Sequence, residues 1–394
     1  MTGLTAEGLA RIVGLQIGLG SRIRKSPFFE ALVRHGLTHV SVYNHMYMPG
    51  SFGDPDEEYK ALVERVSLWD VAAERQVEVA GPDAFALCQY VSARDLRGMK
   101  AGRVRYAPMC DHDGTLINDP MVLKLAEDRF WISIADSDVL LWCRAVAAER
   151  GLDCRVFEPD VSPLGVQGPR ADDTMADLLG EWVRDVPFFG FVETSHDSIP
   201  FVLCRSGWSG QGGFELFLQD GSRGLDLWDA VWAAGEKYGI HPGGPTLNER
   251  IESDLFSYRA DCGAGASPLE VGLNRYVSLD RDDDFIGKVA LLAEQERGPA
   301  QRLVKALLTG ERFPATSESP WPAVRPDGTP CGQVRVAVWS PKYGSNLCLA
   351  LVSADVAGGP FRTVTPSGET LHATHHAYFA EQSPQVDGHT ADGN

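Results

Sequence analysis

Residues 204–218 have the sequence CRSGWSGQGGFELFL, in which a glycine-rich segment separates the end of one apolar run from a second, alternating run. This pattern predicts two strands joined by a turn. Glu215 stands in the second strand between Phe214 and Leu216, where a carboxylate is costly to bury without a partner. Alternation could equally place Glu215 on the solvent face. The glycines favour a binding site, because they let a flat ligand approach the backbone, and Trp208 offers a stacking surface.

The composition limits which classes of protein need to be considered. A chain of 394 residues exceeds one ordinary hydrophobic core, so two or three domains are expected. Its 44% hydrophobic and 23% charged residues are typical of a soluble globular protein, and no apolar run is long enough to cross a bilayer. A net charge of −18 argues against nucleic acid as a partner. The eight cysteines lack CxxC spacing, which indicates reduced thiols and a cytoplasmic location.

Strand and helix signals alternate along the chain without an internal repeat. Residues 56–69 carry apolar side chains at helical spacing and predict an amphipathic helix. The turn sequence His-Asp-Gly at 112–114 predicts a hairpin. Beyond a polar linker around 298–299, runs of strand-forming residues between Pro and Gly turns predict a small barrel or sandwich. Residues 381–394 are polar and are expected to be disordered.

Several motifs that would indicate other chemistry are incomplete. IGLGSR lacks the third glycine and the preceding strand of a dinucleotide fingerprint. His372, His375 and His376 have no further ligand at suitable spacing, so a solvated strand face is favoured over a metal site. The acidic run at 280–284 lacks the ligand order of a calcium loop and is interpreted as a solvated turn. We therefore expect no metal, and no GxSxG motif suggests a covalent nucleophile.

Polar residues in apolar or glycine-rich settings form the candidate site. Asp119, in LINDPMVLKL, is the second carboxylate of interest, although Asn-Asp-Pro is also ordinary turn chemistry. The full set is Tyr43, Asn44, His45, Tyr106, Asn118, Asp119, Pro120, Trp208, Gln211, Glu215, Arg250 and Glu252.

Together these residues resemble the tetrahydrofolate-dependent methyl-transfer family that contains the glycine-cleavage aminomethyltransferase, and within it the dimethylsulfoniopropionate demethylase branch. The segments that carry the resemblance are VYNHMYMPGSFG, WDVAAERQVEV, NDPMVLKL, WISIADSDV, VQGP, SGWSGQGGFEL, ERIESDLFSY and FIGK. They follow in the family's order between about residues 22 and 290, and the likeness is weaker beyond.

The resemblance implies an α+β fold with three domains in a ring, a cloverleaf, around a central folate channel. The first domain would comprise residues 1–60 and 160–245 and carry the folate and substrate face. The second would comprise residues 61–159 and 246–290, and the C-terminal domain, residues 298–380, would be a β-barrel. Tetrahydrofolate would be the methyl acceptor and a small methylated molecule the donor. The sequence is compatible with a homodimer.

The resemblance also implies roles for individual residues. Glu215 is expected to bind the pterin ring, whose adjacent N–H donors suit a carboxylate that accepts in a fork. Asp119 is expected to be the catalytic residue, close to the reacting nitrogens, where it could orient the folate or relieve positive charge. Residues expected along the folate channel are Tyr106, Asn118, Asp119, Trp208, Gln211, Glu215 and Arg250. Residues expected at the methyl donor are Tyr43, Trp208 and Phe217.

Three positions depart from the demethylase pattern. Gly210 stands where that branch has Lys, Phe217 replaces a Tyr associated with the sulfonium, and Arg259-Ala260 replaces Gly-Asn. These changes leave the donor open. Dimethylsulfoniopropionate, which would give 3-methylthiopropionate, is the leading candidate, and another sulfonium, N-methyl or O-methyl compound is an alternative.

Two other functions remain as alternatives. A glycine-cleavage aminomethyltransferase would have Asp-Asp where this chain has Asn118-Asp119. A folate-binding protein without turnover would carry a reactive-cysteine motif, and the sequence shows none.

Overall fold

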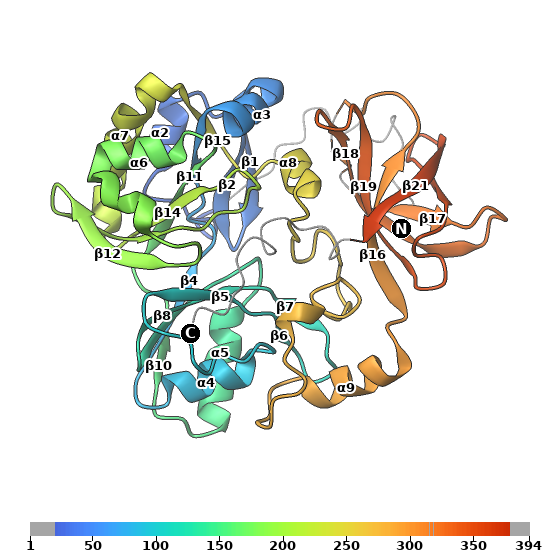
Figure 1. The fold of residues 1–394 in the computed structure, drawn as a ribbon, viewed down its shortest axis with the longest axis horizontal. Coiled ribbons are helices and arrows are strands. Elements are labelled where there is room, and N and C mark those ends of the chain that lie inside the picture. Colours follow the sequence, from blue (N-terminus) through green and yellow to red (C-terminus); the bar gives the residue numbers. More distant parts are fainter. Residues whose placement is uncertain (1–19, 315, 318, 379–394) are drawn as a thin grey trace.

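The computed structural model describes residues 20–314, 316–317 and 319–378. Figure 1 shows three lobes around a central region that is crossed by the segment carrying α8 (Leu247–Glu252). This is the α+β ring expected from the sequence. The predicted disordered tail, 381–394, lies outside the described residues.

The first lobe contains a six-stranded sheet whose outer face is covered by helices (Figure 1). In spatial order its strands are β12 (Phe191–His196), β13 (Ile199–Cys204), β14 (Gly213–Leu218), β11 (Ser162–Gln167), β3 (Val66–Asp70) and β15 (Ile240–Gly243). The covering helices are α2 (Phe29–Arg34), α6 (Ala171–Leu179) and α7 (Gly224–Gly235). Phe214, Leu216 and Leu218 of β14 point into this helix-covered core, so alternation sends Glu215 and Phe217 to the opposite face.

The second lobe contains a five-stranded sheet that faces the first. In spatial order its strands are β10 (Arg155–Phe157), β4 (Gln76–Ala80), β9 (Arg129–Ser133), β8 (Met121–Ala126) and β5 (Arg103–Tyr106). Helices α4 (Ala84–Val91) and α5 (Val139–Glu149) cover its outer face. Its inner face contributes Leu123 and Trp131 to a cluster with Val202 and Phe217 of the first sheet. The two lobes therefore form a stack of four layers, with helices outside and sheets inside.

Shorter elements complete these two lobes. The hairpin predicted at 112–114 is confirmed, because β6 (Met109–Cys110) and β7 (Leu116–Asn118) pair across that turn. A second hairpin, β1 (His39–Tyr43) with β2 (Met46–Ser51), precedes α3 (Pro55–Glu64). The 3-10 helices are Glu181–Asp185, Gly221–Arg223, Glu236–Tyr238 and Asn274–Tyr276.

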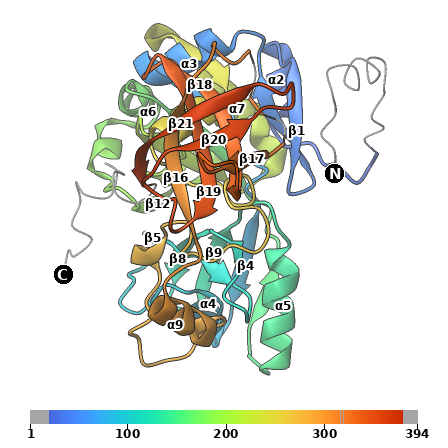
Figure 2. The same cartoon turned by 90° about the vertical axis from the view of Figure 1, so that its right-hand side faces the viewer.

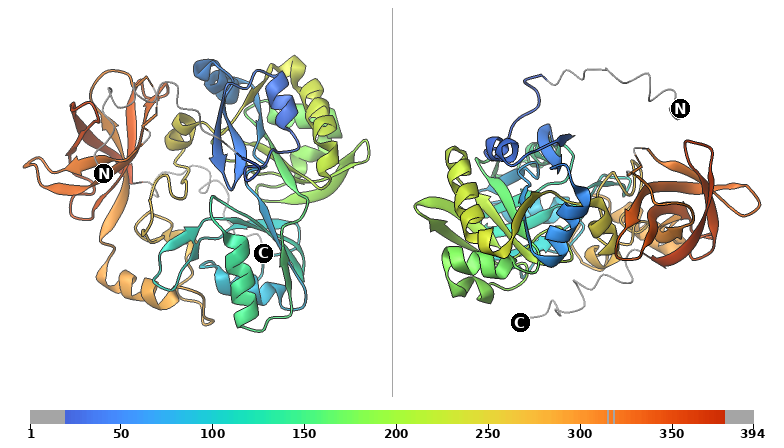
Figure 3. Two further views of the ribbon diagram at one scale, coloured as in Figure 1. Left: turned by 180° about the vertical axis from the view of Figure 1, so that it is seen from behind. Right: turned by 90° about the horizontal axis from the view of Figure 1, so that it is seen from above.

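The third lobe is a closed six-stranded barrel, joined to the rest by α9 (Lys288–Arg297). Its strands are β16 (Gln301–Leu308), β17 (Trp321–Val324), β18 (Pro330–Ser340), β19 (Ser345–Ser353), β20 (Phe361–Val364) and β21 (Thr370–Tyr378). The barrel faces the viewer in Figure 2, and Figure 3 shows it on the opposite side of the ring from α6 and α7. The sequence pattern allowed a barrel or a sandwich, and the closed ring of strands shows that the domain is a barrel.

One element prediction was wrong, and it affects the expected domain division. Residues 56–69 do not form one helix, because α3 ends at Glu64 and residues 66–70 form β3. β3 lies between β11 and β15, and all five of its residues are buried. Its apolar residues happen to continue the helical spacing of α3, which is why the sequence pattern predicted one long helix. β3 belongs to the first sheet, although the expected division after residue 60 assigned it to the second domain; the domain bounds stay a prediction.

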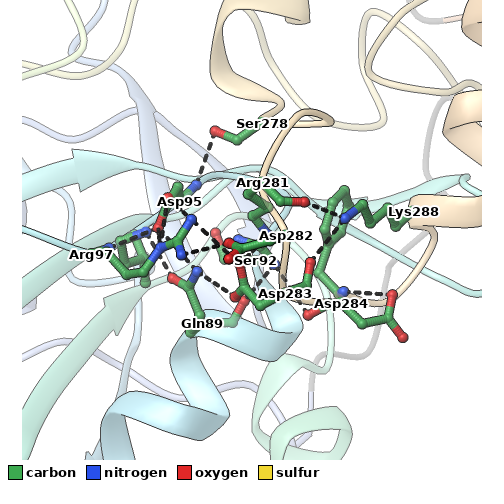
Figure 4. Close-up of polar contacts among 12 residues, drawn as sticks. Gln89, Ser92, Asp95, Arg97, Ser278, Arg281, Asp282, Asp283, Asp284 and Lys288 are labelled. Carbon is green, nitrogen blue, oxygen red and sulfur yellow. Dashed lines mark hydrogen bonds and ion pairs between the residues drawn. The ribbon is translucent and has the colours of Figure 1, made fainter.

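A polar network fastens the segment between α8 and α9 to the second lobe (Figure 4). Arg97 pairs with both Asp95 and Asp282, and Gln89 of α4 donates to Asp283 at 2.8 Å. The acidic run at 280–284 is thus a turn, as expected, but the carboxylates of Asp282, Asp283 and Asp284 accept hydrogen bonds instead of being merely solvated. The network fixes the far end of the segment that lines the centre of the ring.

Candidate active site

A cavity of about 870 Å³ lies where the three lobes meet, which is large enough for a ligand of several rings. The first lobe contributes Trp208 and Glu215, the second Tyr106 and Asp119, and the barrel Trp339. Among the residues expected at the site, those that line the cavity are Tyr43, Tyr106, Asp119, Trp208 and Glu215. The structure therefore brings together residues that are far apart in the sequence.

Glu215 is buried, with 3% of its surface exposed, and it lines the cavity rather than the solvent face. The Ser206 hydroxyl donates a hydrogen bond to its Oε2 atom. Burial raises the pKa of Glu215 to about 6, and the hydrogen bond from Ser206 opposes this rise. The carboxylate is therefore held ready to accept donors from a ligand, with one oxygen partly satisfied.

The glycine-rich turn contributes Gly207 to the cavity wall, and the same residue is also required by a close approach within the protein. A Cβ atom at Gly207, where φ is 155°, would lie 2.1 Å from the side-chain amide of Gln167. That amide is buried and donates to the Ser206 carbonyl at 3.1 Å. The side chain of Gln167, in β11, therefore occupies the space that a Cβ atom at Gly207 would need. The turn still orients Trp208, whose Nε1 donates to the Phe256 carbonyl at 3.2 Å.

Asp119 and Tyr106 form a hydrogen-bonded pair on the second lobe. The Tyr106 hydroxyl donates to Asp119 Oδ2 at 2.8 Å. Burial raises the pKa of Asp119 to about 7, the hydrogen bond from Tyr106 lowers it, and the charge of Asp261 raises it further. A carboxyl group with a pKa near neutrality can take up a proton at physiological pH.

A third carboxylate, Glu74, lines the same cavity but was not selected from the sequence. Burial raises its pKa well above the usual value, and the charges of Glu215 and Asp119 raise it further. Burial also raises the pKa of Tyr43, which lines the same cavity, and the charge of Glu74 adds to that effect. The only available signal was that Glu74 lies within the segment WDVAAERQVEV, between two strands.

Asn118 supports the site from behind instead of lining the cavity. It is fully buried, and its Nδ2 donates to the Ala135 carbonyl at 3.0 Å and to Ser137 Oγ at 2.8 Å. Its Oδ1 accepts from the Ala135 amide at 3.0 Å. All of its hydrogen-bonding groups face the protein, so Asn118 orients the backbone that carries Asp119. Asn118 is not among the residues that line the cavity, and its contact with folate stays a prediction.

Arg250 and Gln211 are also placed behind the cavity wall. Arg250 is fully buried and forms a two-pronged ion pair with Asp261, at 2.7 and 2.8 Å. Its guanidinium lies 5.4 Å from the centre of the Trp208 ring, so it supports that ring. Gln211 donates to Glu249 Oε1 at 3.0 Å and lines a neighbouring, smaller cavity. Neither residue lines the central cavity, contrary to the expectation.

Phe217 lies on the same strand face as Glu215, as alternation requires, but it does not reach the cavity. The second sheet covers it, and its ring centre lies 6.2 Å from that of Trp131. The side chain is fully buried. The contact of Phe217 with the methyl donor stays a prediction; a single strand does not reveal which of its residues another sheet will cover.

Two further members of the candidate set connect the lobes. Asn44, in the turn between β1 and β2, donates to the carbonyls of Ala73 and Ala135 at 3.0 and 3.1 Å. Glu252 of α8 accepts from Tyr59 at 2.8 Å and from Ser340 of the barrel. These residues shape the cavity without facing a ligand.

Residues 28–281 match the GCVT N-terminal domain family, and the chain therefore belongs to that family. It is an enzyme of the tetrahydrofolate-dependent methyl- or aminomethyl-transfer class. It is 40% identical over 349 residues to dimethylsulfoniopropionate demethylase DmdA of Ruegeria pomeroyi, covering 88% of this chain and 94% of that protein. It is 29% identical over 345 residues to an aminomethyltransferase of Symbiobacterium thermophilum, and the match covers 85% of this chain and 90% of that protein.

The fold itself is similar to a solved structure. Aminomethyltransferase T of the Bartonella henselae glycine cleavage system superposes with a TM-score of 0.81 at 21% identity, covering 91% of this chain and 99% of that one. The match confirms the expected α+β fold. In the part of the chain that the structure describes, no three His, Cys, Asp or Glu side chains are grouped as metal ligands. None of the helices within the described ranges is both long and apolar enough to span a bilayer.

Proposed function

We propose that this enzyme transfers a methyl group from dimethylsulfoniopropionate to N5 of tetrahydrofolate, with 3-methylthiopropionate as the other product. The observation that carries the proposal is that Glu215 and the Tyr106–Asp119 pair, from different lobes, line one cavity. The 40% identity to a dimethylsulfoniopropionate demethylase supports this donor over an aminomethyl donor. Among the cavity residues, Glu215 and Trp208 bind the folate, and Asp119 acts at the reacting nitrogen.

Glu215 suits the pterin because its charge is buried and only partly satisfied. The adjacent N–H groups of a pterin can donate to both carboxylate oxygens, which compensates the cost of burial. Trp208 is fixed by its bond to the Phe256 carbonyl and by Arg250 behind it, so it offers a rigid stacking surface. The pterin is thereby held between the first and second lobes, with its reactive edge toward Asp119.

The reaction needs orientation and a proton acceptor, but no general acid. A carbon–nitrogen bond forms with the electron pair of N5, and the carbon–sulfur bond breaks with its pair leaving on a neutral thioether. Asp119 relieves the positive charge that develops on N5 and takes up the proton that this nitrogen loses. Its raised pKa of about 7 suits this role near neutrality. Most of the rate enhancement comes from in-line positioning.

Chromatography of reaction mixtures tests the proposal. The enzyme, tetrahydrofolate and dimethylsulfoniopropionate should give equal amounts of 5-methyltetrahydrofolate and 3-methylthiopropionate, whereas an Asp119→Asn variant should bind folate but turn over slowly. A panel of other sulfonium, N-methyl and O-methyl compounds serves as comparison. Formation of 5,10-methylenetetrahydrofolate and ammonia from an aminomethyl-lipoyl donor, without any methyl transfer, would establish the aminomethyltransferase alternative instead.

A further inference from the structure

We infer that Glu74 is the counter-charge for a positively charged methyl donor, and that it makes the enzyme select cationic donors over neutral molecules of the same shape. The inference rests on the proposed methyl transfer and adds to it the residue that recognises the sulfonium charge. It concerns binding of the donor, not the chemical step.

The backbone around Glu74 is fixed on both sides. Its amide donates to the Val71 carbonyl at 2.9 Å, and its carbonyl accepts from Gln76 Nε2 at 2.7 Å. The backbone carbonyl of the next residue, Arg75, accepts a hydrogen bond from the Ile134 amide at 3.0 Å. The segment joins β3 of the first sheet to β4 of the second. Glu74 is therefore presented to the cavity from a rigid turn at the junction of two lobes.

Glu74 differs from the other two carboxylates in its partners. A hydroxyl donates to each of the others, Ser206 to Glu215 and Tyr106 to Asp119. Within the described residues, no hydrogen bond or ion pair is made by the carboxylate of Glu74. The adjacent Arg75 cannot neutralise it, because the Arg75 guanidinium is bound to Glu158 at 3.0 Å. The carboxylate of Glu74 is thus left for a ligand.

The charges around Glu74 are complementary to a cation. Burial chiefly, and then the charges of Glu215 and Asp119, disfavour the ionised form of Glu74, so a cation bound beside it is what favours that form. Two arginines line the cavity wall: Arg312 is engaged by Asp56 at 2.8 Å, and the Arg275 guanidinium lies over the Tyr276 ring, 4.9 Å from its centre. The pterin is neutral and uses the charge of Glu215, so it leaves the excess negative charge in place. A sulfonium group beside Glu74 would compensate it.

Tyr43 strengthens the argument for a cation. Tyr43 and Glu74 line the same cavity, and the pKa of Tyr43 is raised by burial and then by the charge of Glu74. An aromatic face next to a carboxylate attracts a methylated cation from two directions. A neutral methyl donor would gain little from either group, since neither a carboxylate nor a ring face attracts an uncharged methyl group strongly.

The experiment compares a cation with its carbon isostere. Dimethylsulfoniopropionate and 4-methylpentanoate have the same shape and the same carboxylate, but only the first carries a sulfonium. Binding of each to the enzyme–folate complex is measured by calorimetry for wild type, Glu74→Gln and Glu64→Gln. The last variant is the matched control, because Glu64 is exposed on α3 and its removal changes the net charge equally.

The wild type should bind the sulfonium about ten- to a hundredfold more tightly than the isostere, and Glu74→Gln should abolish most of this difference. KM for the sulfonium should rise by a similar factor, with kcat changed about threefold or less, since the charge acts on binding. Affinity for folate and for 4-methylpentanoate should stay unchanged. A Glu74→Asp variant, which keeps the charge on a shorter arm, should be intermediate, and its melting temperature shows whether the turn is intact.

The possible failures are distinguishable. If Glu74→Gln retains the preference for the sulfonium while its folate affinity is normal, the inference about Glu74 is overturned and the proposed methyl transfer stands. If the wild type forms 5-methyltetrahydrofolate only from neutral donors, the proposed donor is wrong and the inference falls with it. An equal loss in Glu64→Gln would show a general effect of net charge and would also overturn the inference.

Discussion

At the residue scale, the Tyr106–Asp119 pair gives the activity a characteristic pH dependence. Asp119 must be ionised to take up a proton, so kcat/KM should fall as the pH drops through about 7. Tyr106→Phe removes a hydrogen bond that lowers this pKa, so the acid limb should move to higher pH. Asp119→Asn should remove the limb together with most of the activity. Profiles of kcat/KM measured from pH 5 to 9 test these expectations. If the acid limb of Tyr106→Phe lies at the same pH as that of the wild type, the limb reports the ionisation of a group other than Asp119.

Glu215 is the residue on which folate binding should depend most. Replacing it with Gln removes the charge and turns one acceptor into a donor, which should weaken folate binding by about 2–4 kcal/mol. The fold should tolerate the change, because the ligand-free carboxylate is buried at a cost. Calorimetry with tetrahydrofolate measures the effect, and Ser206→Ala, which removes only the supporting hydroxyl, is the natural comparison. Equal affinities in wild type and Glu215→Gln would exclude a pterin contact.

Phe217 should matter for stability and not for the choice of donor. A Tyr at this position would place its hydroxyl between the two sheets, beside Trp131, where a partner would have to be found or the group left unsatisfied. We expect Phe217→Tyr to lower the free energy of unfolding by about 1–3 kcal/mol. Its kcat/KM for dimethylsulfoniopropionate should equal that of the wild type. Urea unfolding measures the predicted loss of stability, and steady-state kinetics measure kcat/KM. A clear gain in activity would mean that position 217 reaches the donor.

At the scale of elements, the turn between β13 and β14 should be intolerant at one glycine and tolerant at another. Gly207→Ala would drive a Cβ atom into the Gln167 amide, whereas a Cβ atom at Gly212 would meet nothing within 4 Å. Both positions have positive φ, so both variants carry backbone strain, but only Gly207→Ala is also overpacked. We expect an additional loss of about 1–3 kcal/mol for Gly207→Ala, measured by urea unfolding. Equal losses would show that the contact with Gln167 relaxes freely.

The elements also show what the sequence could and could not predict. The β6–β7 hairpin was predictable because its turn residues act locally, and so were the strands of the barrel. β3 was missed because a strand covered on both faces has no alternation. The contact of Phe217 was missed because it depends on the second sheet. Glu74 gave no local signal, since its importance comes from two carboxylates that only the fold brings near it.

At the scale of the whole molecule, Glu252 of α8 connects the first lobe to the barrel. It accepts hydrogen bonds from Tyr59 of α3 and from the buried Ser340 of the barrel. Glu252→Ala should lower the free energy of unfolding by about 2–4 kcal/mol, because both hydroxyls lose their acceptor. Tyr59→Phe, which removes one of these bonds, should cost less than half as much. Chemical unfolding of both variants tests this, and equal effects would mean that the contact with the barrel contributes nothing.

The position of β3 in the first sheet has a consequence for synthesis on the ribosome. β3 pairs with β11 on one side and with β15 on the other, and both of these strands follow the whole second lobe in the sequence. The growing chain therefore releases a strand whose residues are all buried in the finished sheet long before either of its neighbours exists. Until residue 243 has emerged, the edges of this strand are open to pairing with other chains. We expect the nascent protein to depend on chaperones during this interval, and fragments that end before β15 to aggregate.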